Sequence, residues 1–130
     1  MLKVRNKSIC FVINSLEGGG AERVICNLLR TMEESFYQQQ CKIYLILLDN
    51  LLEEQACPEY VTKVTLSSNG KFISSYRLLD EWINDNQPDL IVSFLNRSNL
   101  VCSYIGNRRG ISTAISVRGN TTEHFSTSRL

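Results

Sequence analysis

The feature that most constrains the fold is the alternation of short apolar runs with segments of helical periodicity. Four runs are apolar over most of their length and stop at polar or glycine-containing loops: Ser8–Asn14, Lys42–Leu48, Asp89–Phe94 and Ile111–Val117. Such runs are typical of strands that are buried on both faces, as in a parallel sheet covered by helices. A fifth run, Tyr60–Leu66, alternates and predicts a short, half-exposed strand.

The segments between these runs predict helices. Apolar residues from Ala21 to Met32 recur with a period of 3.6 residues, and a second face runs from Phe72 to Ile83 and should end before Pro88. A third face around Leu100–Ile105 should end near Gly110. The order predicts an α/β, Rossmann-like, doubly wound domain, with a mainly parallel sheet of about five strands and helices on both faces.

Length and composition restrict the classes of protein further. With 130 residues, 43% of them hydrophobic and 21% charged, the chain should form one globular domain, residues 1–130. The net charge of +1 argues against nucleic acid as a partner. The longest strongly apolar run, Ile43–Leu48, is too short to span a bilayer. The segment Arg118–Leu130 is polar and is expected to be an irregular tail.

Cysteine usage predicts a reducing compartment. The five cysteines form no C-x-x-C pair, and three lie within apolar segments, where a free thiol packs as a small hydrophobic side chain. We therefore expect reduced, structural thiols in a cytoplasmic protein.

A glycine-rich loop follows the first predicted strand and opens the first helix. Gly18, Gly19 and Gly20 are consecutive, and Ala21 and Glu22 follow them. Glycines allow a ligand to approach the backbone closely, and the free N–H groups and dipole of a helix N-terminus favour an anion such as a diphosphate. The alternative is a flexible strand-to-helix turn without a ligand.

Other nucleotide and metal motifs are missing. The fingerprint G-x-G-x-x-G could start at Gly18, but Arg23 occupies the third glycine position. Asp49 ends the second strand as a ribose-binding acid would, so a nicotinamide-dependent oxidoreductase stays an alternative. The P-loop motif is absent, and the sole histidine, His124, excludes a two-histidine zinc motif. No metal site or resident cofactor is expected.

Polar residues also follow the later strands, where ligands of open α/β sheets bind. Asn96–Asn99 follow the strand that ends at Phe94, and Arg118 and Asn120 follow the last strand. Arg118 could bind phosphate or carboxylate through its guanidinium fork. The alternatives are helix capping by Asn96 or Ser98 and a solvent-facing Arg118.

These segments resemble a known family. The loop GGGAERV (Gly18–Val24), the run PDLIVSFLNRSNLV (Pro88–Val101) and the run GISTAISVRGN (Gly110–Asn120) are similar, in the same order, to motifs of family 4 glycosyltransferases. That family has the GT-B fold of two Rossmann-like domains. The resemblance implies a retaining, metal-independent transfer of a sugar from a nucleotide-diphosphate donor to a glycan or lipid-linked acceptor.

The resemblance also implies which residues form the site and what the chain represents. Gly18–Glu22, Arg97, Arg118 and Asn120 would face the substrates across an interdomain cleft. The nucleotide-binding domain of the family carries a Glu-x7-Glu motif that this sequence lacks. The chain is therefore expected to be the N-terminal, acceptor-side domain, inactive without its missing C-terminal domain. A stand-alone nucleotide- or sugar-binding module is the main alternative.

Two physical expectations concern partners. The face that would meet a second domain should expose apolar groups, which predicts self-association at high concentration. The basic start, with Lys3, Arg5 and Lys7, could contribute a peripheral contact with an anionic membrane.

Overall fold

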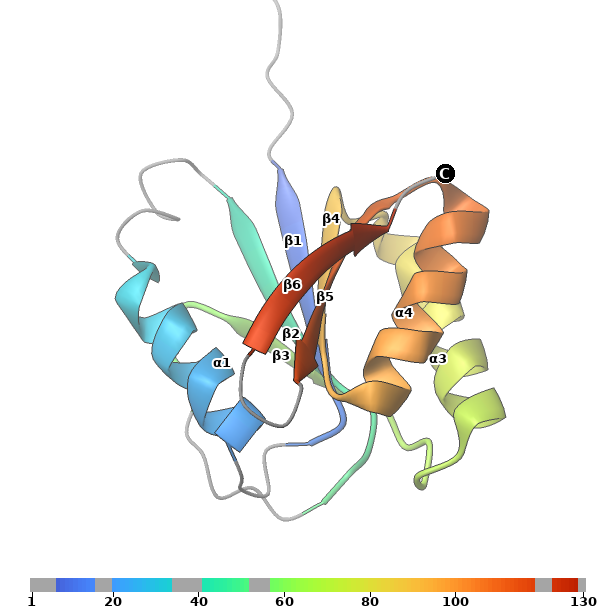
Figure 1. Ribbon diagram of the computed structural model, residues 1–130, viewed down its shortest axis with the longest axis horizontal. Coiled ribbons are helices and arrows are strands. Elements are labelled where there is room, and N and C mark those ends of the chain that lie inside the picture. The colour runs from blue at the N-terminus through green and yellow to red at the C-terminus, as the bar shows by residue number, and fades with distance from the viewer. Residues whose placement is uncertain (1–6, 16–19, 34–40, 52–56, 119–122, 129–130) are drawn as a thin grey trace, which may run out of the picture.

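A computed structural model describes residues 7–15, 20–33, 41–51, 57–118 and 123–128 (Figure 1). In these residues, six strands form one sheet and three helices cover its two faces. The strands are β1 (Ser8–Ile13), β2 (Lys42–Leu47), β3 (Thr62–Thr65), β4 (Leu90–Phe94), β5 (Ser112–Arg118) and β6 (Glu123–Ser128). The helices are α1 (Gly20–Thr31), α3 (Phe72–Asn86) and α4 (Asn96–Arg109).

The strand order is β3-β2-β1-β4-β5-β6, and the first five strands in that order are mutually parallel. The central strand β1 pairs with β2 on one side and with β4 on the other, so the chain changes its direction of winding at β1. This topology is the doubly wound, Rossmann-like α/β fold, as the alternating pattern predicted.

The edge strand β6 corrects one expectation. The segment after Arg118 was expected to be an irregular tail, but residues 123–128 pair with β5 in antiparallel register. The sequence EHFSTS lacks the apolar character that identified the other strands. An antiparallel edge strand is held by backbone hydrogen bonds and can leave one face in water, so hydropathy alone did not reveal it.

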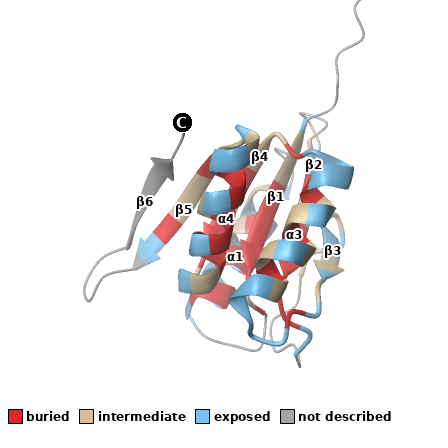
Figure 2. Cartoon of the chain, turned by 90° about the vertical axis from the view of Figure 1, so that its right-hand side faces the viewer, coloured by how far each residue is buried: buried red, intermediate tan, exposed pale blue. Residues whose placement is uncertain are grey.

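Two apolar layers explain why the central strands are hydrophobic on both faces. Successive side chains of β1 point to opposite sides: Phe11 and Ile13 pack with α1, and Cys10 and Val12 pack with α3 and α4. The second layer, beneath α3 and α4, includes fully buried Leu79, Ile83 and Ile105 (Figure 2). None of the described helices is long and apolar enough to cross a bilayer.

The cysteines are free thiols, as expected. Cys10, Cys26 and Cys102 are buried within these layers, and Cys41 and Cys57 are partly exposed. Burial raises the pKa of Cys102 to about 12, although a hydrogen bond with Ser93 opposes the shift. Burial, reinforced by the nearby Cys102, likewise raises the pKa of Cys10. The thiols of Cys10 and Cys102 are therefore neutral and serve as packing groups.

The ends of the two later helices follow the sequence signals. Helix α3 ends at Asn86, and Gln87 adopts a left-handed conformation (φ 46°) directly before Pro88. Helix α4 ends at Arg109, and Gly110 directly after it has a φ of 69°. Both features stop a helix because a left-handed residue or a proline cannot continue it.

Helix α4 packs on β5 so closely that one position requires glycine. A Cβ atom at Gly106 would collide with Thr113 Oγ1 and would lie 3.1 Å from Thr113 Cβ. We predict that Gly106→Ala lowers the free energy of unfolding by about 1–3 kcal/mol, because overpacking forces the helix off the sheet. Chemical denaturation measures this loss. Asn107→Ala, at the adjacent exposed position of the same helix, is the control and should be neutral or slightly stabilising.

Candidate functional site

The candidate site is the edge of the sheet at which the parallel strands end and the helices begin. Asn14 and Ser15 follow β1, Asp49 follows β2, and the first turns of α1 and α4 lie at this same carboxyl edge (Figure 1). Because β1 pairs with both β2 and β4, the winding reverses here, and doubly wound folds bind ligands at such a reversal.

Three consecutive residues of the first turn of α4 each bind a different neighbouring strand end. Arg97 pairs with Asp49 after β2. Ser98 Oγ donates a hydrogen bond to Asn14 Oδ1 after β1, at 2.7 Å. Asn99 Nδ2 donates to the carbonyl oxygen of Ser116 in β5, at 2.7 Å. This single turn therefore holds the ends of three strands in fixed relative positions.

The Arg97–Asp49 pair is the centre of a polar cluster. Both terminal nitrogens of the Arg97 guanidinium donate to the Asp49 carboxylate, Nη1 to Oδ1 at 3.1 Å and Nη2 to Oδ2. Ser68 Oγ and the Gly70 amide also donate to Oδ1, at 2.8 and 2.9 Å. Arg97 Nη1 lies 3.2 Å from Ser75 Oγ on α3. The two charged side chains are only 16% and 10% exposed, so the pair is largely desolvated.

The cluster keeps the Asp49 carboxylate charged. Burial by itself would raise the pKa of Asp49, but hydrogen bonds from Arg97, the Gly70 amide and Ser68, together with the Arg97 charge, hold that pKa below its ordinary value. All of these partners favour the charged carboxylate. With both of its oxygens used in this way, Asp49 is not free to bind the ribose of a dinucleotide.

The turn from β4 into α4 is conformationally unusual. Leu95, which precedes the helix, has a φ of 77° and a ψ of 152°, a region that residues other than glycine rarely adopt. Helix α4 has no side-chain N-cap, and Ser98 uses its hydroxyl to bind Asn14. The alternative of helix capping by Asn96 or Ser98 is therefore not observed, and the Ser98 hydroxyl instead makes a tertiary contact with Asn14.

The structure locates part of the predicted site. Gly20 is the exposed first residue of α1, while Ala21 and Glu22 are buried in its first turn. Gly18, Gly19 and Asn120 lie outside the described residues, and Arg118 is described only through its backbone, at the end of β5. Arg97 lies at the edge but is engaged by Asp49. Direct contact of these residues with a substrate stays a prediction.

Sequence reasoning identified Arg97 but not the cluster around it. Ser68 and Ser75, which complete the cluster, are 29 and 22 residues away from Arg97. Neither belongs to a motif. Asp49 alone carried a signal, because it directly follows an apolar run. The partner of Asp49 could not be inferred from the sequence, because an acid that follows a strand can bind either a ligand or another side chain of the same protein.

A cavity of about 360 Å³ lies beside this edge, between α4 and β5. It is lined by Asn96, Asn99, Leu100, Ser103, Ile115 and Val117. Asn99 is buried, and its Oδ1 has no hydrogen-bond partner among the described residues. Within the described part of the chain, no three His, Cys, Asp or Glu side chains gather as metal ligands would.

The first test concerns the energetic coupling of Arg97 and Asp49. We predict that Arg97→Met lowers the free energy of unfolding by about 2–3 kcal/mol, because it leaves a buried carboxylate without its counter-charge. Asp49→Asn should cost a similar amount. The double variant should cost clearly less than the two losses added together, as a double-mutant cycle from urea unfolding measures. Additive losses would show that the two side chains do not interact.

The second test follows from the lowered pKa of Asp49. A carboxyl with a lower pKa in the folded state stabilises the fold above its unfolded pKa, near 3.9, and this contribution disappears as the pH falls through the folded pKa. The stability gap between wild type and Asp49→Asn should therefore be widest near neutral pH and narrow below about pH 4. Urea unfolding over a pH series measures the gap; a gap that is constant down to pH 3 contradicts the assignment.

Comparison with known proteins adds a structural likeness. The chain is similar to the apo form of the lipopolysaccharide outer core galactosyltransferase WaaB, with a TM-score of 0.62 and 22% sequence identity. The similarity covers 83% of this chain and 32% of the galactosyltransferase, so the chain spans about a third of its length. No protein-family model matches the sequence, and neither does any curated protein. At 22% identity this likeness shows the fold alone, which is the Rossmann-like α/β fold described above.

Proposed function

We propose that the chain is the acceptor-side domain of a retaining, metal-independent glycosyltransferase. The full enzyme would transfer a sugar from a nucleotide-diphosphate donor to a glycan or lipid-linked acceptor. The observation that carries the proposal is the likeness, over 83% of the chain, to a lipopolysaccharide galactosyltransferase. It gains support from the independent sequence resemblance of three ordered motifs to family 4 glycosyltransferases.

The proposed reaction uses the carboxyl edge as one wall of a cleft. A hydroxyl of the acceptor attacks the anomeric carbon of the donor sugar on the same face from which the nucleoside diphosphate departs. The bond between that carbon and the diphosphate breaks, and the leaving diphosphate takes up the proton of the hydroxyl. The exposed start of α1 at Gly20 offers backbone N–H groups and a positive helix end to the departing diphosphate. Arg118 is the last residue of β5. Arg118 and Asn120, which lies outside the described residues, are proposed to contact the substrates.

Arg97 and its partners have a supporting task in this proposal. The guanidinium of Arg97 forms an ion pair with Asp49 and so positions the start of α4 against the end of β2. Asn99 binds the same helix to β5 through its Nδ2. Asn99 also lines the adjoining cavity, and its Oδ1 has no hydrogen-bond partner among the described residues. A hydroxyl of the acceptor, entering that cavity, would supply the missing donor.

A runner-up function, nicotinamide-dependent oxidation, loses its main support. It relied on Asp49 as the acid that binds the ribose of the cofactor. Both oxygens of Asp49 are occupied by Arg97, and Ser68 and Gly70 add further bonds to one of them. A binding module that recognises a nucleotide sugar without turnover remains the alternative that experiment must separate.

The decisive measurement is a transfer assay with labelled nucleotide-diphosphate sugars and a panel of free and lipid-linked glycans. The complete reading frame that contains this sequence and the 130-residue chain by itself should be assayed side by side. We expect transfer by an enzyme that includes a nucleotide-binding domain and none by the chain alone, because preorganised stabilisation of the leaving diphosphate needs both domains. Binding without any turnover in either form would favour the binding module.

Arg118→Ala provides the site-directed test in the active form. A charge-assisted hydrogen bond to a phosphate or a sugar is worth about 1.5–3 kcal/mol, so kcat/KM should fall about 10- to 100-fold. Arg77→Ala is the matched control, since Arg77 is exposed on α3 and pairs only weakly, at 3.9 Å, with Glu81. Equal activity of the two variants would remove Arg118 from the proposed site.

A further inference from the structure

The cavity between α4 and β5 contains a buried polar group that no described residue binds. We call this cavity of about 360 Å³ the α4/β5 cavity; it is lined by Asn96, Asn99, Leu100, Ser103, Ile115 and Val117. Asn99 is only 8% exposed, and its Oδ1 has no hydrogen-bond partner among the described residues. The amide cannot be turned around, because Nδ2 donates to the Ser116 carbonyl oxygen, which can only accept. A buried oxygen in this state is costly, so a donor from a ligand is expected at this position.

The lining of the α4/β5 cavity combines polar and apolar surface. Asn96, Asn99 and Ser103 are three and four residues apart along α4, so they share one side of that helix. Ile115 and Val117 are two residues apart in β5 and share one face of the strand. A volume of about 360 Å³ is at the small end of the range for ligand pockets. The cavity therefore suits a small ligand with polar groups along one edge and C–H groups on one face.

The charges near the α4/β5 cavity are paired. Among the described residues, no charged side chain lines the cavity. The charged residues of α4 are Arg97, Arg108 and Arg109, and each of them pairs with an acid that belongs to neither α4 nor β5. At the end of β5, Arg118 is opposite Glu123 of β6 in the strand register, so these two positions carry opposite charges. An anionic ligand would find no counter-charge in the described lining, which favours an uncharged ligand.

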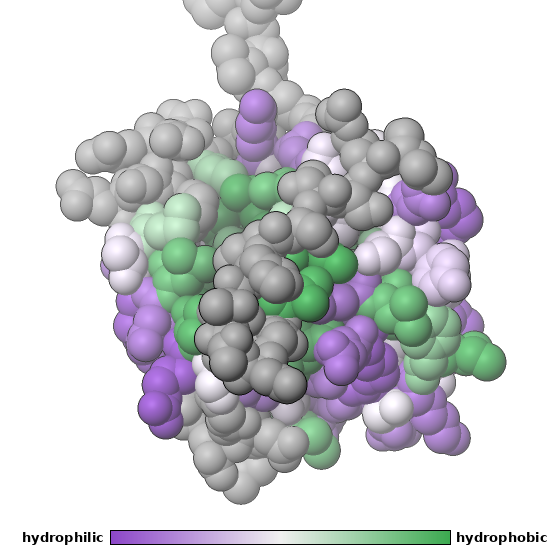
Figure 3. Space-filling model, viewed as in Figure 1, coloured by the Kyte–Doolittle hydropathy of each residue, from purple (hydrophilic) through white to green (hydrophobic). Residues whose placement is uncertain are grey.

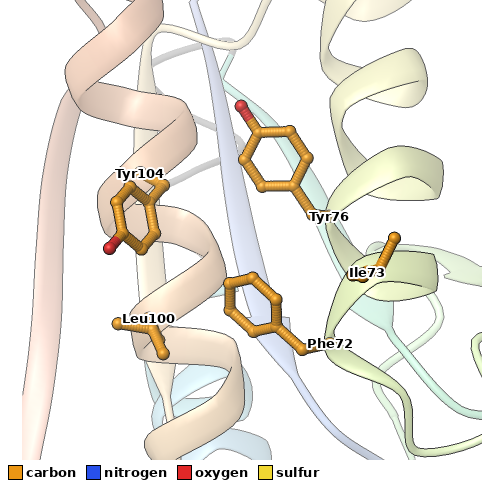
Figure 4. Close-up of a pocket in the computed structure, with 5 residues that line it drawn as sticks. All are labelled: Phe72, Ile73, Tyr76, Leu100 and Tyr104. Carbon is orange, nitrogen blue, oxygen red and sulfur yellow. The ribbon is translucent and has the colours of Figure 1, made fainter.

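A larger cavity, between the beginnings of α3 and α4, lacks such a polar group. It measures about 580 Å³ and is lined by Phe72, Ile73, Tyr76, Leu100 and Tyr104 (Figure 4). Figure 3 shows hydrophobic side chains on the surface over the beginnings of these two helices, towards the right of the view. None of these five residues has a buried polar atom without a hydrogen-bond partner. The α4/β5 cavity is therefore the stronger candidate for a ligand that carries hydroxyl groups.

We propose that the α4/β5 cavity binds one uncharged sugar ring of the acceptor. A hydroxyl of this sugar donates a hydrogen bond to Asn99 Oδ1, and other hydroxyls contact Asn96 and Ser103. The C–H face of the ring lies on Ile115 and Val117. The inference rests on the proposed function, which makes a sugar the ligand with this chemistry. It goes beyond that function by stating that the sugar bound here is neutral and that Asn99 recognises one of its hydroxyls.

An NMR titration of the isotope-labelled 130-residue chain tests the proposal. The probes are the methyl glycosides of glucose, galactose, mannose and N-acetylglucosamine, together with those of glucuronic and galacturonic acid. We expect at least one neutral glycoside to shift the side-chain amide signals of Asn99 and the backbone amide signals of Ile115 and Val117. Both uronates should bind at least about fivefold more weakly than the best neutral glycoside, because a carboxylate finds no counter-charge in the cavity.

Two variants with matched controls test the contacts. Asn99→Leu has a similar shape but lacks Oδ1, so binding should weaken at least about tenfold. Ser103→Leu fills the cavity from a half-buried position and should have the same effect. Asn107→Leu on α4 and Ser74→Leu on α3 are the same substitutions outside the cavity and should bind as the wild type does. Circular dichroism verifies the fold of each variant, and Ser103→Leu decides if Asn99→Leu does not fold.

Three results would overturn the proposal. The first is the absence of shifts at Asn99, Ile115 and Val117 with every neutral glycoside. The second is wild-type affinity of the folded Ser103→Leu variant. The third is uronate binding that is as tight as that of the best neutral glycoside, since the cavity would then not select an uncharged sugar.

The transfer assay separates this inference from the proposed function. If a neutral glycoside binds in the α4/β5 cavity but the complete reading frame transfers no sugar, the transferase proposal fails and the cavity assignment stands. If the complete enzyme transfers sugar and Ser103→Leu leaves its KM for the acceptor unchanged, the cavity assignment fails and the transferase proposal stands.

Discussion

The structure depends above all on the ion pair between Arg97 and Asp49 and on the two hydrogen bonds next to it. These contacts come from one helical turn, yet they reach the ends of β2, β1 and β5. Desolvation makes the pair costly to break, because either charge alone would be buried without compensation. The carboxyl edge of the sheet is therefore held in one arrangement, and a rigid edge is a condition for binding a substrate in a defined position.

The same turn explains why strain and unpaired groups gather at this edge. Leu95 adopts an unfavourable backbone conformation so that α4 can start close to the strand ends. Asn99 is held by Ser116 and leaves Oδ1 without a partner among the described residues. Such local departures from ideal geometry persist when surrounding contacts enforce them, and they are concentrated at functional sites. The proposed substrate edge and the observed irregularities coincide.

Two surfaces with different chemistry thus begin at the starts of the same helices. The carboxyl edge is polar and hydrogen-bonded, whereas the surface between α3 and α4 around Ile73 and Tyr104 is apolar and exposed.

The alternation of apolar runs and helical faces was sufficient to predict the layers, the parallel strands and the doubly wound order, because burial on both faces imposes continuous hydrophobicity. It placed the glycine loop and Arg97 at the carboxyl edge for the same reason. It missed β6, whose pairing depends on backbone hydrogen bonds rather than on burial. Only the tertiary structure revealed that Asp49 serves Arg97 instead of a ligand, since residues 48 positions apart meet through chain folding alone. Burial imposes a regular spacing of apolar residues that can be recognised in a sequence. Side-chain pairing across a sheet edge imposes no such spacing.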